Sequence, residues 1–180
     1  MTESRLLLQH FLAALAYRTQ KALRGAPEGF ADFRASPTSR TPHELLWHMT
    51  GLMGYARTML NGGEFEPPCL PGLAEEIARF HVTLEALHRD FADAALNATI
   101  SDQQFLQGPL ADAMTHAGQL AFLRRLHGSP VASENFIFAA IDSKNVSAQQ
   151  ALPKAPDPDW RPEDMPPAPG PRRRRPDAAS

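Results

Sequence analysis

The chain has 180 residues, a net charge of −2 and a single cysteine. This length suffices for one domain with a buried core, and the small net charge provides no general attraction to nucleic acid or to anionic membranes. One cysteine excludes an internal disulfide framework and is typical of a reducing compartment, so we expect a cytoplasmic protein. Because the net charge is small, we expect no nucleic-acid partner.

No apolar run is long enough to cross a bilayer. Residues 5–16, RLLLQHFLAALA, resemble the apolar region of a signal peptide. Gln9 and His10 interrupt that run, however, and the apolar pattern continues beyond it with a helical period. We therefore interpret this stretch as part of a helix.

The first predicted helix spans about residues 4–24, where an apolar stripe recurs at helical spacing, formed by Leu8, Leu12, Leu15, Thr19 and Leu23. A loop rich in proline and glycine follows. The second helix is predicted from Thr41 to about Leu60, because Thr41 and Glu44 match a capping box and Pro42 occupies the first helical position.

The third helix is predicted over about residues 72–96, followed by a connection over 99–108. The fourth long helix is predicted over 109–128, with Pro109 at its first position and Gly128 as its stop signal. A short helix over 134–141 would pack onto the others. Four long amphipathic helices indicate an all-α four-helix bundle with this short additional C-terminal helix.

Proline recurs throughout the C-terminal part of the chain, which also contains the run Arg172–Arg175. Such a composition cannot form a packed core. We therefore expect a helical domain over residues 1–146 and an extended or disordered tail over 147–180. The arginine run permits an adaptor function toward acidic partners, but a solubilising tail is the simpler interpretation.

A carboxylate and two imidazoles occupy positions suited to a metal ion. Asp112 and His116 lie four residues apart, on one face of the fourth long helix, and His48 points inward from the second helix. Three protein ligands with an open fourth position are typical of a catalytic metal site. Gln119 and Asn135 are candidates for groups that orient these ligands.

Simpler interpretations remain open at these positions. An inward histidine is often a hydrogen-bonded core residue, and an Asp–His pair at this spacing also occurs on exposed helices, so a metal-free structural bundle is an alternative. His81, Glu85 and His88 form a rival cluster, which we expect to be a solvated face. Cys69 has no base near it in the sequence and is expected to be an unreactive thiol.

Three stretches together resemble the DinB-like metalloenzyme family. They are RTPHELLWHMTGLMGYA, PLADAMTHAGQLAFLRRLHGSPV and SENFIFAAI, and the resemblance extends from the first helix to about residue 146. The most specific part is THAGQLAFLRR, which approximates the family's H-x-G-Q-L-x-x-L-R-R pattern.

The resemblance implies a four-helix bundle, often a homodimer, with a divalent metal held by three histidines. His48 and His116 match two of them, whereas Asp112 departs from the third. Zinc or nickel is favoured, and iron or manganese is compatible with the harder aspartate ligand. The family further implies a thiol-dependent S-transferase or a hydrolase that acts on a small electrophile, with a low-molecular-weight thiol as a partner.

Overall fold

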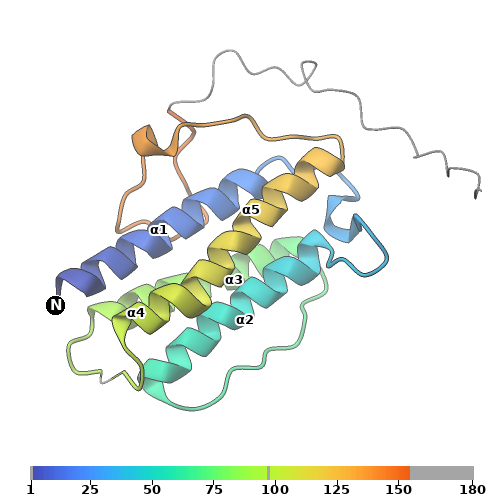
Figure 1. Ribbon diagram of the computed structural model, residues 1–180. Helices are drawn as coiled ribbons and strands as arrows, with labels where there is room; N and C mark the ends of the chain where they lie inside the picture. Colours follow the sequence, from blue (N-terminus) through green and yellow to red (C-terminus); the bar gives the residue numbers. More distant parts are fainter. Residues whose placement is uncertain (1, 97, 155–180) are drawn as a thin grey trace, which may run out of the picture.

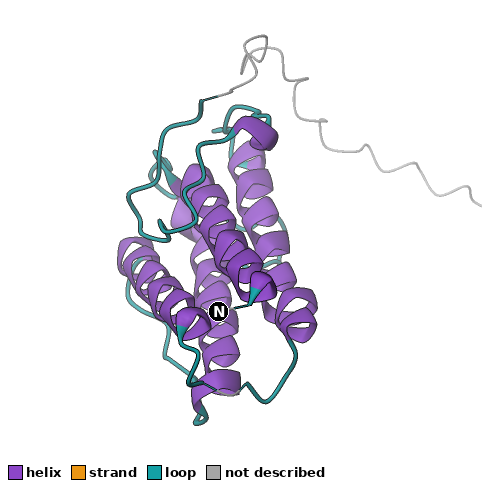
Figure 2. Cartoon of the chain, turned by 90° about the vertical axis from the view of Figure 1, so that its left-hand side faces the viewer, coloured by secondary structure: helices purple, strands orange, loops and turns teal. Residues whose placement is uncertain are grey.

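The computed structural model describes residues 2–96 and 98–154, and every regular element among them is helical (Figures 1 and 2). The four long helices are α1 (Glu3–Leu23), α2 (Pro42–Asn61), α3 (Leu73–Ala92) and α5 (Ala111–Leu126). The predicted all-α four-helix fold is confirmed. The expected tail falls largely outside the described residues, as does its run Arg172–Arg175.

Each long helix contacts two of the other three. Helix α1 packs against α3 and α5, and α2 packs against α3 and α5, which gives a closed bundle. Figure 1 shows α5 between α1 and α2, with α3 behind them. Helices α1 and α5 run in one direction while α2 and α3 run in the other, so the parallel pair α2 and α3 is joined by a crossover over residues 62–72 (Figure 1).

The bundle encloses one apolar core to which all four long helices contribute. Its largest fully buried side chains are Tyr17, Phe30, Phe80, Phe105, Leu12, Leu15, Leu46, Met49, Met53, Leu84, Leu87 and Leu110. The predicted stripe on the first helix is therefore the face that this helix turns inward. Among the described residues, no helix is both long and apolar enough to span a membrane.

The start of α2 follows the predicted capping box. Thr41 Oγ1 accepts a hydrogen bond from Glu44 N, Glu44 Oε2 accepts one from Thr41 N, and Pro42 begins the helix. These contacts satisfy backbone donors that a helix leaves free in its first turn. They also fix the direction in which α2 presents His43 and His48.

The prediction that the fourth long helix begins at Pro109 is wrong. The chain is already helical from Asp102 in α4 (Asp102–Phe105), where Ser101 forms a second capping box with Gln104. A π-helical segment, η2 (Leu106–Leu110), then leads into α5, with a kink at Gly108. Pro109 is accommodated at this kink because its ring and missing N–H disrupt regular helical pairing.

The prediction of a helix over 134–141 is also wrong. Only a 3₁₀ turn forms there, η3 (Phe136–Phe138), in which Ile137 is 86% exposed. The Glu134 carboxylate instead accepts hydrogen bonds from Tyr17 and Lys21 of α1. This anchors the segment across the bundle and prevents it from winding into a separate helix.

The prediction of a solvated face at His81 is wrong as well. His81 is buried beneath the segment that follows η3, where its Nδ1 lies 2.8 Å from Val146 O. His88 Nε2 lies 2.9 Å from Ser143 O. The C-terminal segment therefore covers this part of α3, where His81 and His88 each have one ring nitrogen beside a backbone carbonyl.

Candidate metal centre

Helices α2 and α5 bring His48, Asp112 and His116 together. One potential ligand atom from each lies within 4.8 Å of the others. His116 Nε2 lies 3.2 Å from Asp112 Oδ1, and His48 Nε2 lies 3.9 Å from Asp112 Oδ2. The two imidazole rings approach edge to face, with centroids 4.9 Å apart.

These separations fit a single ion. Metal–ligand distances of about 2.1 Å at a tetrahedral centre place two nitrogen or oxygen ligands about 3.4 Å apart. The two carboxylate–imidazole separations, 3.2 and 3.9 Å, lie on either side of that value. Asp112 is exposed and can rotate, so the three ligands can converge with small side-chain movements.

The tautomer of His116 is suited to ligation. Its Nδ1 lies 2.9 Å from Gln119 Oε1, and since this oxygen is an acceptor, the ring proton belongs on Nδ1. The lone pair of Nε2 is then available. This Nε2 is buried and makes no hydrogen bond, although Asp112 Oδ1 is close. A buried acceptor without a donor is costly, and a bound cation would satisfy it.

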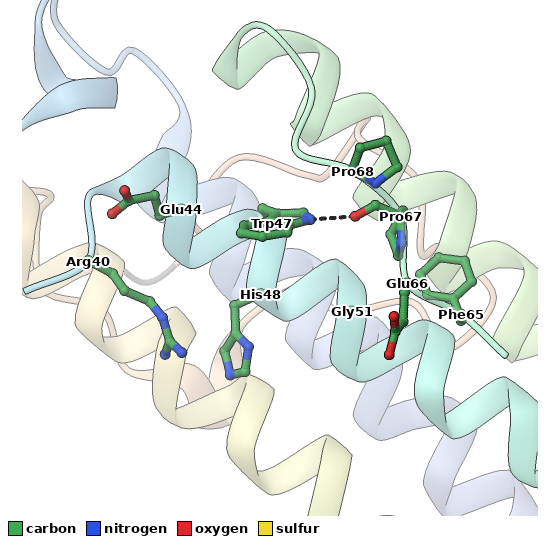
Figure 3. A pocket seen from close by; sticks show the side chains of 9 residues that line it. All are labelled: Arg40, Glu44, Trp47, His48, Gly51, Phe65, Glu66, Pro67 and Pro68. Atoms are coloured by element: carbon green, nitrogen blue, oxygen red, sulfur yellow. Dashed lines mark hydrogen bonds between the residues drawn. The ribbon is translucent and has the colours of Figure 1, made fainter.

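The surroundings of His48 favour its neutral form, which is the form that binds metals. Burial is the largest cause that holds the pKa of His48 below its usual value, the positive charge of Arg40 adds to this shift, and Asp112 opposes it. Figure 3 shows the Arg40 and His48 side chains projecting side by side. No carboxylate within the described ranges lies close enough to pair with Arg40, so its charge is available to a ligand.

Two open hollows border the cluster, one at His48 and one at His116. One, of about 750 Å³, includes His48, Arg40 and Trp47 (Figure 3). The other, of about 600 Å³, includes His116, Gln119 and again Arg40. A small molecule in either hollow can therefore reach both the cluster and the guanidinium.

The far wall of the larger hollow comes from the crossover. Trp47 Nε1 donates a hydrogen bond of 2.9 Å to Pro67 O, which ties the crossover to α2 (Figure 3). Phe65 lies against Gly54, where a Cβ atom would overlap its ring. Sequence spacing does not indicate Arg40, Trp47 or Gly54, because what each contributes depends on the path of the crossover and of the 25–40 loop.

Asn135 is not brought to this cluster. Its Oδ1 accepts a hydrogen bond from Ile137 N and caps the η3 turn. The neighbouring Glu134 is bound to α1 through Tyr17 and Lys21. Of the two candidate orienting residues, only Gln119 contacts a proposed ligand.

The donor set of one carboxylate and two imidazoles is suited to a divalent transition metal such as zinc, nickel, iron or manganese. No protein-family model, curated protein or solved structure matches the chain in the comparisons made. The site must therefore be interpreted from its own chemistry.

Proposed function

We propose that this protein is a divalent-metal-dependent enzyme that acts on a small anionic substrate at His48, Asp112 and His116. The observation that carries the proposal is the buried, unpaired Nε2 of His116, which lies beside the Asp112 carboxylate and the His48 ring. A bound metal would supply Lewis acidity and lower the pKa of a water or thiol at its open position.

The chain's own residues have defined tasks in this proposal. Gln119 keeps the proton of His116 on Nδ1, so that Nε2 faces the cluster. Arg40 lies in both hollows and can bind a carboxylate or another anionic group of the substrate. The substrate's reactive end would then be held at the cluster while its anionic end is bound by Arg40.

The resemblance to DinB-like proteins supports a finer proposal, a thiol-dependent S-transferase. A low-molecular-weight thiol would release its proton to solvent, and the resulting sulfur nucleophile would form a bond to an electrophilic carbon as that carbon's bond to its leaving group breaks. Hydrolysis would differ only in using water as the nucleophile. Zinc or nickel as the metal, a homodimer and a cytoplasmic location remain predictions that accompany this proposal.

Metal analysis tests the central claim. Purified wild-type protein, His116→Ala and the control His10→Ala are loaded with Co²⁺ and Zn²⁺, desalted and assayed for metal, with circular dichroism to confirm folding. His10 is an exposed histidine of α1. We expect His116→Ala alone to lose about one equivalent of metal, and equal metal content in all three would contradict the proposal.

A metal-free binding bundle is the second candidate, and the 3.2 Å approach of Asp112 Oδ1 to His116 Nε2 favours it. Protonation of His116 would turn this approach into an internal ion pair without any metal. The two candidates differ in their response to chelation. A metal that binds only the folded state raises Tm, so the first proposal predicts that a chelator lowers the Tm of the wild type by more than that of His116→Ala, whereas a metal-free cluster predicts equal shifts.

A further inference from the structure

A second cluster of potential ligands lies near the N-terminal ends of α2 and α3. It consists of His43 from the first turn of α2, Cys69 from the crossover and Glu76 from the first turn of α3, with one ligand atom of each within 4.8 Å of the others. Cys69 Sγ lies 3.7 Å from His43 Nε2. These residues come from three separate segments and share none with the first cluster.

The separation between sulfur and nitrogen is the one that a tetrahedral ion requires. Zinc lies about 2.3 Å from a cysteine sulfur and about 2.1 Å from a histidine nitrogen, so at a tetrahedral angle the two ligand atoms are about 3.6 Å apart. The separation observed between Cys69 and His43, 3.7 Å, agrees with this value. A weak S–H hydrogen bond to the imidazole would also fit this distance, and the two possibilities differ in their response to metal.

The crossover that carries Cys69 is hydrogen-bonded to both α2 and α3. Pro67 O accepts the hydrogen bond from Trp47 of α2, and Pro68 O accepts one of 2.8 Å from Arg79 of α3. Cys69 follows these two anchored residues directly. Its position next to His43 is therefore set by contacts that do not involve the thiol.

Glu76 is held in a fixed orientation by Thr50 and Arg79. Its side chain is fully buried, Oε1 accepts hydrogen bonds from Thr50 Oγ1 at 2.9 Å and from Arg79 Nε at 3.1 Å, and Oε2 pairs with the Arg79 guanidinium. Partners of this kind fix a carboxylate ligand in place. Since Arg79 compensates the Glu76 charge, His43 and the Cys69 thiolate would supply most of the affinity.

We propose that His43, Cys69 and Glu76 form a second metal site, selective for thiophilic divalent ions such as Zn²⁺ and Cd²⁺. Binding would form a metal–sulfur bond and release the thiol proton to solvent, with water in the fourth position. The first cluster has no sulfur ligand, so the two sites differ in preference. A metal here would join the crossover to both α2 and α3, beside the wall of the hollow that contains His48.

Sulfur-to-metal charge-transfer absorption tests the site directly, because Cys69 is the only cysteine in the chain. Full-length reduced protein is titrated with Cd²⁺ and, separately, with Co²⁺. We expect a charge-transfer band that saturates at one equivalent of sulfur-bound metal, is absent in Cys69→Ser, and needs at least tenfold more Cd²⁺ for half-saturation in His43→Gln. His10→Gln is the matched control and should behave like the wild type.

The outcomes separate this proposal from that for the first cluster. His116→Ala should keep the band, and Cys69→Ser should keep the metal equivalent assigned to His48, Asp112 and His116. Absence of the band in wild-type protein would overturn the second site. A band with the same half-saturation in His43→Gln would overturn it too, since the thiol would then bind metal without the imidazole.

Discussion

A buried arginine near the end of α5 provides the strongest test of how the bundle is held together. Arg124 is 4% exposed, and its guanidinium donates five hydrogen bonds. The acceptors are the carbonyl oxygens of Ala22, Arg24, Gly25 and Ser129 and the hydroxyl of Ser129. Ala22 lies in the last turn of α1, where a helix leaves carbonyl groups without partners, and Arg24 and Gly25 directly follow the helix.

The substitution Arg124→Met keeps much of the side-chain stem and removes all five bonds. Charge-assisted hydrogen bonds contribute at least about 1.5 kcal/mol each, or roughly 7.5 kcal/mol in total. Burying the guanidinium offsets several kcal/mol of this, and the same burial lowers the pKa of Arg124. We therefore expect the free energy of unfolding to fall by about 3 kcal/mol.

Urea denaturation followed by circular dichroism measures this change. Arg125→Met is the matched control, because Arg125 is the neighbouring arginine of the same helix and is exposed. We expect the control to differ from wild type by less than about 0.5 kcal/mol. Equal losses in the two variants would refute the argument that the carbonyl contacts of Arg124 hold α5 to α1.

Three further predictions concern the crossover, pH and the anion site. Gly54→Ala should lower the free energy of unfolding by about 1–3 kcal/mol, because the added Cβ would overlap Phe65. Gly51→Ala is the control and should cause no such loss, because its Cβ meets open space. Equal urea midpoints for the two variants would contradict this packing. Burial is the main cause that holds the pKa of His81 below its usual value. The unfolded chain therefore takes up more protons than the folded one, and stability should fall as the pH drops below about 6.5; His81→Gln should reduce that slope in urea titrations, and an unchanged slope would assign it to other groups. Arg40→Gln should weaken binding of thioglycolate to Co²⁺-loaded protein about tenfold, measured by calorimetry, since a charge-assisted contact is lost; unchanged affinity would remove Arg40 from the substrate site.

Local sequence signals predicted most of the helices because their determinants are local. The capping box at Thr41 and Glu44 and the apolar stripe of the first helix both act within a few residues, and both have the expected outcome. One error comes from a distant contact, and another from a local capping box upstream of the predicted helix start. Glu134 binds to α1 instead of starting a helix, and Pro109 lies in a chain that Ser101 has already capped into a helix.

The candidate site was only partly accessible from sequence. Helical spacing placed Asp112 and His116 together, and the inward face of α2 placed His48 toward the core. Nothing in the spacing indicated that Arg40 would lie beside His48, because a loop positions it. Likewise, the contact between His43 and Cys69 depends on the return path of the crossover. The Cys69 thiol has no base near it in the sequence, but the folded chain places the His43 imidazole beside it.

The parallel arrangement of α2 and α3 has a consequence for how this site could diversify. A chain that must re-enter at the same end of the bundle has to travel back along the outside of α2 (Figure 1). Residues 65–68 of this return line the hollow that contains His48 (Figure 3). None of the crossover residues 62–72 belongs to the apolar core. Their sequence and the length of this segment can therefore change while the core stays the same. Selectivity for different small molecules could thus evolve in one external segment while the ligand-bearing helices stay unchanged.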